Sequence, residues 1–425
     1  MQKYISKFQN QYLLLQYLVK WLIISAIIAI CSGIASSIFL YSLQWATNTR
    51  ENYQFLLYLL PLGGMLIGVL YHKFGSGVEK GNNLILDEIH QPKKIIPFKM
   101  APMVLLGTIA THLFGGSAGR EGTALQMSAS IADQFTKLFK LKNRDRKIIL
   151  ISGMAAGFGS VFGTPFAGAV FGLEVYYMGS IRYKALIPAI MSSMLANYVT
   201  HFIGPEHTHY HIDIFPDMSL KTFFLISLLG IIAGLTARLF AKSTHWWSKL
   251  FRKHIKYSPL RPFAGGVIII ILTLLLGTRT FLGLGVPTIV DSFSLQLNSY
   301  DFLLKLLFTA ITLGAGFKGG EVTPLFFIGA ALGNALSLFI PLPMAFLAGL
   351  GFVAVFSGAA NTPLACAIMA IELFGIEIGI YAALVCSISY LFSGHEGIYG
   401  SQIIGDAKHQ LWLKDQDKPL SDSSK

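Results

Sequence analysis

The chain has 425 residues, of which 53% are hydrophobic and only 13% are charged, and its formal net charge is +12. The charged fraction is about half of the roughly 25% that is usual in soluble domains, which excludes an ordinary soluble globular protein. The basic excess does not indicate a nucleic-acid partner, because Lys and Arg cluster in short connections at 93–99, 137–147 and 242–261, as the positive-inside bias of cytoplasmic loops predicts. The composition predicts an all-α polytopic membrane protein whose surroundings are a lipid bilayer.

The first predicted element is the N-terminal segment 1–20, which mixes charged and apolar residues without a small-residue cleavage site. We therefore predict no removable signal peptide and expect an amphipathic helix on the cytoplasmic face. A first membrane repeat follows at 21–203, with helices expected near 21–44, 54–72, 98–114, 124–138, 148–160, 165–178 and 184–203.

A polar connection at 204–219 separates the first repeat from a second one at 220–398. Helices of the second repeat are expected near 220–240, 262–278, 302–315, 323–337, 341–357, 363–374 and 377–393. The remainder, 399–425, is predicted to be a pore-lining helix from Tyr399 toward Leu413 and a short polar cytoplasmic tail, with no soluble regulatory domain after it. Several segments are shorter than the ~20 residues that span a bilayer. Such segments indicate broken or re-entrant helices that line a cavity.

Two landmarks recur in the two repeats. Gly116–Leu125 reads GSAGREGTAL, and Gly316–Leu325, 200 positions later, reads GFKGGEVTPL. A Thr-Pro pair is followed nine residues after its proline by a glutamate in both repeats, at Glu174 and at Glu372. Duplication explains both recurrences. Gly-interrupted segments at matching places favour inverted repeats around a substrate site, although the number of crossings in each half is open and a parallel repeat is the alternative.

Four interruptions place glycine or a polar residue just before a helix: 81–84, 119–123, 319–323 and the turn before Tyr399. Helix N-termini present free N–H groups and a partial positive charge, which favour anions. Several such ends at one point would bind an anion without a full positive charge, weakly enough for the ion to leave. The sequence therefore predicts an anion pathway.

Glu121 lies among these helix ends, and an ionisable residue inside hydrocarbon indicates a functional site. When ionised, its carboxylate can fill the anion site itself; when protonated, it can leave and admit the ion. Because burial favours the neutral carboxyl group, one side chain can couple proton movement to anion movement. The alternative is that Glu121 caps its own helix or pairs with Arg120.

The stretch Gly119-Arg-Glu-Gly122 resembles the second signature of the CLC chloride channels and proton-coupled antiporters, and residues 320–324 resemble the third signature, usually Gly-x-Phe-x-Pro. Residues 81–83 stand at the place of the first signature, Gly-Ser-Gly-x-Pro, and Tyr399 matches the pore tyrosine. The resemblance implies a homodimer with one pore per subunit, built from inverted repeats. It makes Glu121 the external gating glutamate, with Glu321 beside the pore as a second candidate for proton coupling. The anion-binding residues that it implies are Asn82, Asn83, Gly119, Arg120, Gly122, Val322, Thr323 and Tyr399.

The chain departs from the chloride pattern at four positions. Asn82 replaces a serine, Val322 replaces a phenylalanine, Val175 stands where antiporters often carry an inner proton glutamate, and Glu321 replaces an apolar residue. This set resembles the CLC-F branch, the fluoride–proton antiporters, whose first motif often reads Gly-Asn-Asn or Gly-Met-Asn.

Fluoride is small and strongly hydrated, so a site for it should offer directional donors in place of water. The Asn82 amide and the hydroxyls of Thr323 and Tyr399 can donate, and hydrogen bonds to a charged acceptor are strong. Asn82 can alternatively serve as a helix cap. Glu321 can carry protons or form a structural pair with Lys318.

Other polar residues have simpler interpretations. Glu174 and Glu372 are expected to be structural acids that reach a loop amide or water. His207, His209 and His211 alternate at metal-ligand spacing in the polar connection, but a solvated loop without metal is the prediction. The three cysteines, at 31, 366 and 386, lie in apolar stretches and are expected to pack as small hydrophobes.

The leading hypothesis is a proton-coupled fluoride exporter of a bacterial inner membrane, with fluoride or chloride and protons as the transported partners and no cofactor. A chloride–proton antiporter or a chloride channel is the alternative within the family, and a membrane scaffold or sensor with a vestigial pore is the alternative outside it. No constellation of acid, nucleophile and metal indicates an enzyme.

Overall fold

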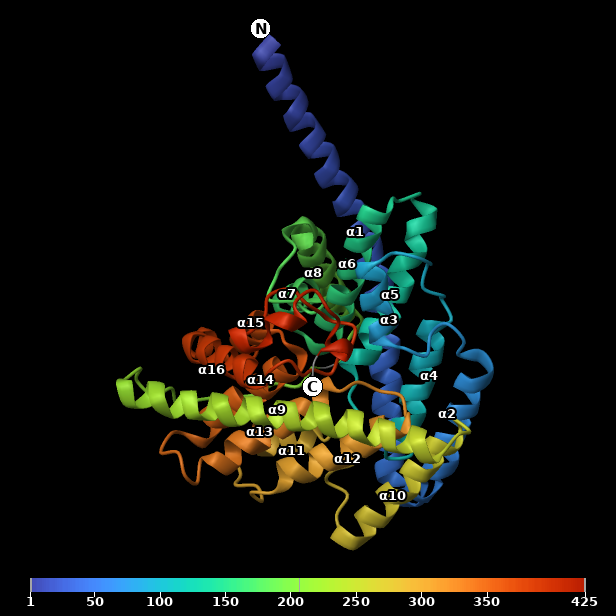
Figure 1. Ribbon diagram of the computed structural model, residues 1–425, viewed down its shortest axis with the longest axis vertical. Helices are drawn as coiled ribbons and strands as arrows, with labels where there is room; N and C mark the ends of the chain where they lie inside the picture. Colours follow the sequence, from blue (N-terminus) through green and yellow to red (C-terminus); the bar gives the residue numbers. More distant parts are fainter. Residues whose placement is uncertain (1, 206, 424–425) are drawn as a thin grey trace.

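The computed structural model describes residues 2–205 and 207–423, without the side chains of residues 2–9. These residues fold mostly into α-helices, whose lengths range from six to 51 residues. Four of the described helices, at 10–52, 54–74, 183–203 and 220–254, are long and apolar enough to cross a membrane by length and composition. The predicted class, an all-α polytopic membrane protein, agrees with this architecture (Figure 1).

The helices of the first half are α1 (Gln2–Asn52), α2 (Leu60–Phe74), α3 (Asn82–His90), α4 (Met100–Leu113), α5 (Glu121–Leu138), α6 (Asn143–Phe162), α7 (Pro165–Glu174) and α8 (Leu186–Ile203). Those of the second half are α9 (Leu220–His254), α10 (Leu260–Leu276), α11 (Val286–Asp291), α12 (Asp301–Ala315), α13 (Val322–Leu336), α14 (Met344–Ala360), α15 (Pro363–Phe374) and α16 (Gly379–Phe392). One small parallel sheet pairs β1 (Tyr177–Met178) with β2 (Ile403–Ile404). Single 3-10 turns lie at Gln54–Leu59, Tyr183–Ala185, Ile376–Ile378, Gln410–Asp415 and Leu420–Asp422.

α1 is one continuous helix, so the helix boundary predicted at residue 20 is wrong. The segment contains no proline and its first glycine is Gly33, which leaves nothing to end a helix near residue 20. Its N-terminal part projects from the body of the molecule (Figure 1), and residues 10–20 are exposed. The placement of this part at the cytoplasmic face stays a prediction.

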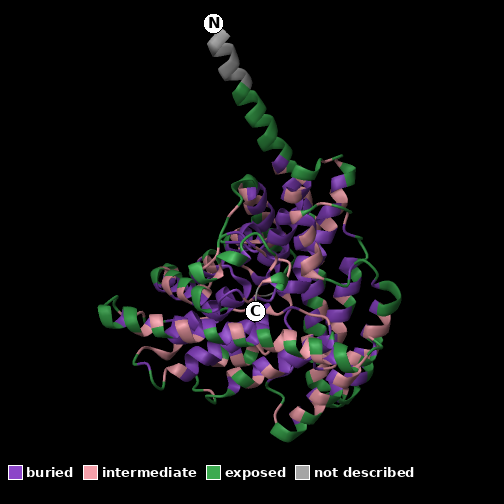
Figure 2. Ribbon diagram, in the orientation of Figure 1, coloured by how far each residue is buried: buried purple, intermediate pink, exposed green. Residues whose placement is uncertain are grey.

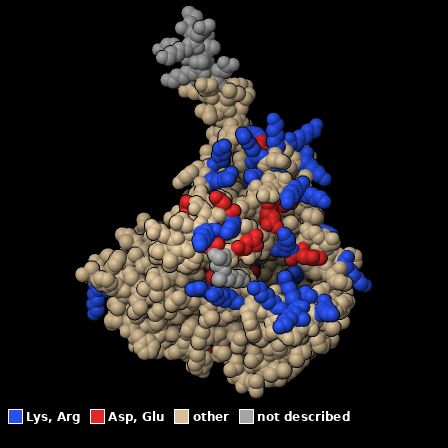
Figure 3. All heavy atoms as spheres, in the orientation of Figure 1, with Lys and Arg blue, Asp and Glu red and all other residues tan. Residues whose placement is uncertain are grey.

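α9 continues for 14 residues beyond the predicted end at residue 240. The basic cluster at 242–261 therefore lies mostly on a helix and not in a connection, which corrects the sequence-based interpretation. Lys and Arg also gather beside the base of the α1 projection (Figure 3). Both groups still agree with a cytoplasmic face rich in positive charge.

The corresponding Thr-Pro helices of the two repeats pack in opposite directions, as an inverted repeat predicts for this pair, and the inverted relation of the whole repeats stays a prediction. α7 and α15 are the corresponding Thr-Pro helices, and each has a glutamate in its last turn that reaches the start of the other. Glu174 accepts hydrogen bonds from the amides of Leu364 and Ala365 at 3.1 and 2.9 Å, while Glu372 accepts from those of Phe166 and Ala167 at 2.9 and 2.7 Å. The last turn of each helix can lie at the N-terminus of the other only if the two helices are antiparallel. The predicted structural role of both acids, the capture of a backbone amide, is what these contacts provide.

The centre of the body is aromatic and buried (Figure 2). Phe326 of α13 stacks on Phe352 of α14 with ring centroids 4.1 Å apart, and Phe158 of α6 stacks on Phe171 of α7 at 4.6 Å. All four rings are fully buried. The repeats therefore share one core, and the helix ends beside it are held by packing.

The helix predicted from Tyr399 to Leu413 is absent. In the part of the chain that the structure describes, residues 399–409 contain no helix, and β2 within them pairs with β1. Glycines at 394, 397, 400 and 405 lower the helix propensity of this segment. The polar tail is also only partly free, since Asp415 and Leu420 are buried.

Lys408 fixes this C-terminal segment to the membrane helices. Its buried ammonium donates to the Tyr390 carbonyl at 2.6 Å, to the Ser393 hydroxyl at 2.9 Å and to the Asn361 side chain at 2.5 Å. Burial lowers the pKa of Lys408 well below its ordinary value, because the ammonium has exchanged water for uncharged oxygens. The segment that carries Tyr399 is thus folded against the body without being helical.

Candidate functional site

The two glycine-rich motif loops meet at a backbone bridge. Gly119 donates its N–H to the Gly320 carbonyl at 2.6 Å, and Gly320 donates to the Gly119 carbonyl at 2.8 Å, which makes an isolated antiparallel pair. A Cβ on Gly320 would lie 2.7 Å from the Gly122 nitrogen, closer than side-chain atoms approach backbone. Glycine at this position lets α5 and α13, one from each repeat, begin side by side.

Glu121 crosses this junction and caps the opposite repeat. It is the first residue of α5 and is fully buried. Its Oε2 accepts hydrogen bonds from the Thr323 N–H at 3.1 Å and from the Thr323 hydroxyl at 2.7 Å. Its Oε1 lies 3.5 Å from Nε of Arg120. The alternative of a pair with Arg120 is therefore present as a long contact, but the shorter bonds go to α13.

The start of α13 is a small anion cradle. Val322 and Thr323 open the helix, and Pro324 follows with no N–H to offer. The next amide, that of Leu325, is already bonded to the Glu321 carbonyl at 3.1 Å. The free amides at this helix end are therefore those of residues 322 and 323, and the carboxylate of Glu121 occupies the second one as an anion would.

Asn82 and Glu321 converge on the same place from other elements. A Cβ added to Gly122 would lie 3.1 Å from Nδ2 of Asn82 and 3.5 Å from Oε2 of Glu321. Because Gly122 has no side chain, the Asn82 amide and the Glu321 carboxylate can both approach the N-terminal turn of α5. The predicted convergence of the first, second and third motifs is confirmed in space by this geometry.

Tyr399 reaches the same region without a helix behind it. Its ring is 2% exposed and stands edge-on to Phe171, with ring centroids 6.5 Å apart. Three residues later, Gln402 donates to the carbonyls of Val175 and Ala360 at 2.7 and 3.1 Å. Sequence reasoning missed Gln402, and nothing in its surroundings in the chain singled it out.

Asn83 has a different contact from the one predicted. Its Oδ1 accepts a hydrogen bond from the Ser401 N–H at 2.9 Å. This bond ties the start of α3 to the segment just after Tyr399. Asn83 therefore positions the tyrosine, and its participation in anion binding stays a prediction.

Five buried polar atoms around this junction have no hydrogen-bond partner among the described residues. They are Asn82 Oδ1, Arg120 Nε, Glu121 Oε1, Glu321 Oε2 and Tyr399 Oη. Buried polar groups are nearly always satisfied in native proteins. Arg120 Nε and Glu121 Oε1 keep only their long contact of 3.5 Å, and donors and acceptors without hydrogen bonds at one place suit an exchangeable ion and its protons.

An outer hollow of about 320 Å³ leads toward Arg120. Its wall includes Leu40, Gln44 and Asn48 of α1 and His207 of the connection between the repeats. The Arg120 side chain, 12% exposed, lies between this hollow and the fully buried Glu121. A positive charge at the floor of an entrance attracts anions to the gate.

Glu321 does not pair with Lys318, which removes the structural alternative for this acid. The Lys318 ammonium lies over the Tyr71 ring, 3.9 Å from its centroid. Among the described residues, no ion pair is formed by Glu321. A buried acid beside the anion path without a cation next to it is suited to carrying a proton.

The three histidines of the connection do not assemble a metal centre. His207 is half-buried and its Nε2 lies 3.0 Å from the Ser160 carbonyl, whereas His211 is exposed beside Asp213. Within residues 2–205 and 207–423, no group of three His, Cys, Asp or Glu side chains could hold a metal ion. Tyr210, which alternates with the histidines, packs inward against Phe352 at 5.3 Å.

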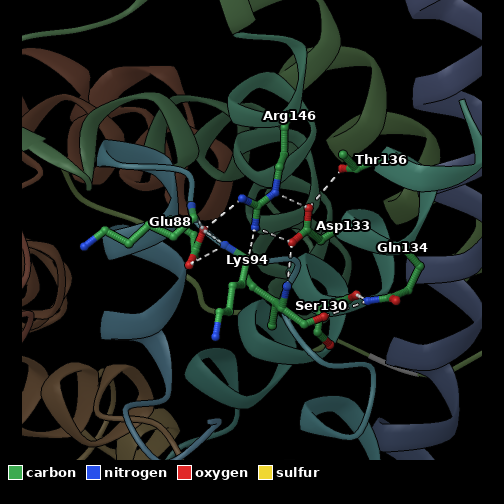
Figure 4. A network of polar contacts seen from close by, with 9 residues as sticks. Glu88, Lys94, Ser130, Asp133, Gln134, Thr136 and Arg146 are labelled. Atoms are coloured by element: carbon green, nitrogen blue, oxygen red, sulfur yellow. Dashed lines mark hydrogen bonds and ion pairs between the residues drawn. The ribbon is translucent and has the colours of Figure 1, made fainter. Parts of the chain in front are cut away.

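Arg146 belongs to the basic cluster at 137–147, but it is buried and joins the helices that carry the site. Arg146 bonds Glu88 of α3 at 2.8 Å and Asp133 of α5 at 2.8 Å through two different nitrogens (Figure 4). It also donates to the Lys94 carbonyl at 2.6 Å. α3 and α5, which carry Asn82 and Glu121 at their first turns, are thereby joined to α6.

Comparison with known proteins agrees with this geometry. Residues 63–394 match the family model described as voltage gated chloride channel. The chain is 50% identical over 419 residues to a chloride/fluoride channel protein of Pseudomonas syringae pv. tomato, covering 97% of this chain and 93% of the relative.

Solved structures show the same fold. A crystal structure of a CLC-type fluoride/proton antiporter superimposes with a TM-score of 0.88 at 33% identity, covering 91% of this chain and 98% of that one. A slow cyanobacterial Cl−/H+ antiporter superimposes with a TM-score of 0.75 at 19% identity, covering 88% and 94%. With two motif loops bridged at mid-fold and a buried glutamate across them, the chain belongs to the CLC family of voltage-gated-type chloride channels and anion–proton transporters, and it is a multi-pass membrane protein.

Proposed function

We propose that this chain exports fluoride across a bacterial inner membrane in exchange for protons. The observation that carries the proposal is the Glu121 carboxylate at the N-terminus of α13, held by the Thr323 amide and hydroxyl. A carboxylate in that position competes directly with an anion for the same donors. Transport then requires that Glu121 be protonated and leave.

The cycle follows from this competition. Protonation of Glu121 removes the charge that holds it on Thr323, and fluoride takes the two vacated donors. Return of the ionised side chain expels the anion, and the proton is released on the other side. Glu321, whose Oε2 lies beside the same cradle, is the second group available to carry the proton.

Fluoride is favoured over chloride by the kind of donors present. The candidate site offers three side-chain donors in place of apolar contacts: Asn82 Nδ2, the Thr323 hydroxyl and the Tyr399 hydroxyl. The small Val322 stands where chloride members carry a phenylalanine. A strongly hydrated ion needs directional donors to offset its lost water. The fluoride/proton antiporter named above, at 33% identity over nearly its whole length, supports the same choice.

Chloride is the competing substrate, since the Pseudomonas relative is named for both ions. Purified protein in liposomes loaded with equal concentrations of fluoride and chloride distinguishes them. Ion-selective electrodes should record fluoride efflux at least about tenfold faster than chloride efflux, which corresponds to about 1.4 kcal/mol of selectivity. Equal rates, or faster chloride, would make the chain a chloride transporter.

We further propose a homodimer in which each protomer has its own pathway, because Glu121, Asn82, Glu321 and Tyr399 are all supplied by one chain. Light scattering of the purified protein should give the mass of two chains. No residue of a second copy is needed at the anion path.

A further inference from the structure

A second cavity lies far from the anion path, at the base of the α1 projection. It has a volume of about 720 Å³ and lies between α1, the end of α3, the start of α6 and the turn before α8. Basic side chains gather on the surface around this base (Figure 3). The proposed transport cycle makes no use of this cavity.

The cavity wall is strongly cationic. Arg144, Lys147, Arg182 and Lys184 line it, and none of the four forms an ion pair with a carboxylate among the described residues. The one acid in the wall, Asp145, is already paired with Lys20 outside it at 2.5 Å. Four cations with no acid left for them indicate an anionic occupant.

Two polar side chains in the same wall also lack partners. The Tyr176 hydroxyl belongs to a residue only 2% exposed, and neither it nor His90 Nε2 has a hydrogen-bond partner among the described residues. A buried hydroxyl and a ring nitrogen left unpaired beside four cations complete a set of donors for anionic oxygens.

The remaining surroundings are apolar. Ile89, Ile148 and Ile151 line the cavity, and Tyr17 joins it to the projecting part of α1. That part exposes the apolar Leu13, Leu14, Leu15, Leu18 and Val19 together with the polar Gln16 and Lys20. A helix with an apolar and a polar face of this kind lies at a membrane surface, so the cavity opens next to lipid head groups.

We propose that this cavity binds the phosphate group of an anionic phospholipid from the cytoplasmic leaflet, with Arg182, Lys184 and the Tyr176 hydroxyl among its ligands. Basic pockets between membrane helices on that side suit such head groups. The apolar wall then receives the glycerol and the first carbons of the acyl chains. Free phosphate shares the charge but not the affinity for this wall.

The cavity is also connected, through α3 and α6, to the residues of the proposed anion path. His90 is the last residue of α3, whose first residue is Asn82. Arg146, which holds α3 and α5, lies on α6 between Arg144 and Lys147 of the cavity wall. A bound head group would add support to α3 at the end opposite to the anion path.

The test compares lipid binding by two pairs of variants that lose the same charge. The full-length protein, purified in a neutral detergent, is titrated with phosphatidylglycerol, and retained lipid is counted by native mass spectrometry. Arg182→Gln with Lys184→Gln should weaken binding at least about tenfold, whereas Lys137→Gln with Lys142→Gln, exposed cations outside the cavity, should change it less than about twofold.

Tyr176→Phe serves as a variant that keeps the charge and the ring. It should weaken phosphatidylglycerol binding about threefold to tenfold, while the unfolding temperature without added lipid stays unchanged. Phosphatidylcholine and inorganic phosphate are the comparison ligands. Equal loss in both charge pairs, inorganic phosphate binding as tightly as phosphatidylglycerol, or unchanged binding because a second copy covers the cavity would each overturn the proposal.

Discussion

The carboxylate of Glu121 lies between the two repeats. Its hydrogen bonds explain why the proposed gate can hold its position and still be released. Hydrogen bonds to a charged acceptor contribute about 1.5–3 kcal/mol each, and both of its short bonds go to Thr323. Protonation weakens both at once. We therefore expect the proposed gate to respond to one proton.

Replacement of Glu121 by glutamine should separate anion flux from proton flux. Glutamine keeps the shape but not the charge, so it cannot compete for the α13 amides as an anion does. Liposome assays with a fluoride electrode and a pH dye should show continued fluoride movement and no coupled proton movement. Glu377→Gln, an exposed acid, is the control; persistent coupling in Glu121→Gln would refute the gate.

Glu321 is predicted to be the second proton carrier. Glu321→Gln should lower coupled fluoride turnover about 10²-fold or more, the usual effect of losing a positioned proton-transfer group. Lys318→Gln should leave the proton-to-fluoride ratio unchanged, because Lys318 lies on the Tyr71 ring and not on the acid. Uncoupling by Lys318→Gln instead would restore the ion-pair interpretation.

At the residue scale, the sequence predicted most of the side chains of the candidate site, and their roles stay predictions. An acid in apolar surroundings, glycine-rich breaks and donor side chains are visible in one dimension, and Glu121, Thr323, Asn82, Glu321 and Tyr399 were all predicted to meet. Asn83 and Gln402 were not assigned their contacts, since each acts through a backbone group from a remote segment.

Among the elements, α7 and α15 show most directly how the two repeats hold each other. Each helix donates two amides to the glutamate in the last turn of the other. A carboxylate at a helix N-terminus satisfies free amides and interacts favourably with the helix dipole. Both copies of the Thr-Pro motif thus perform one reciprocal task.

Loss of either glutamate should cost a similar amount of stability. Glu174→Ala and Glu372→Ala are each expected to destabilise the protein by about 1–3 kcal/mol, because two amides lose a charged acceptor. The two caps lie at opposite ends of a helix pair roughly 15 Å long, so the double variant should be additive within about 0.5 kcal/mol. Thermal unfolding in detergent measures all three, with Glu377→Ala as the control; a cost in one variant alone would contradict the reciprocal arrangement.

The ion pairs of Arg146 with Glu88 and Asp133 also hold helices together. Arg146→Met should cost about 3–5 kcal/mol, because it leaves Glu88 and Asp133 buried without a cation. Lys142→Met, an exposed neighbour, should have little effect on the same unfolding curve. Neutralising both acids together with Arg146→Met should recover part of the loss, and no recovery would show that packing and not charge is responsible.

Helix boundaries were the least predictable feature. α3 was not predicted as a helix of its own, since nine residues carry too little periodicity. α9 extends past residue 240 because its basic residues continue along a helix at the membrane edge, where charge does not end a helix. The segment after Tyr399 is not helical because its partners, β1 and the acceptors around Lys408, are distant in the chain.

At the scale of the whole molecule, the face shown in Figure 3 carries many Lys and Arg side chains, while Glu121 is buried. The positive-inside bias assigns this face to the cytoplasm. In the proposed cycle, protons would then enter past Glu121 from the opposite side as fluoride leaves.

A pH gradient alone should therefore drive fluoride against its own gradient. Liposomes with equal fluoride on both sides, at pH 7.5 inside and pH 6.5 outside, should lose lumenal fluoride to the bath as protons enter. Fluoride and pH electrodes follow the two ions together. Liposomes with Glu121→Gln should stay at equal concentrations; a flux in wild type that dissipates gradients but never creates one would identify a channel.

The hydrogen-bonded contact between Gly119 and Gly320 has a mechanical consequence. Many secondary transporters rock one bundle of helices against the other to expose a fixed binding place alternately to the two sides. Here two backbone hydrogen bonds join the two halves at Gly119 and Gly320, so a rocking motion would break both bonds in every turnover. We therefore expect the ion to cross a stationary scaffold in which the moving part is no larger than one side chain.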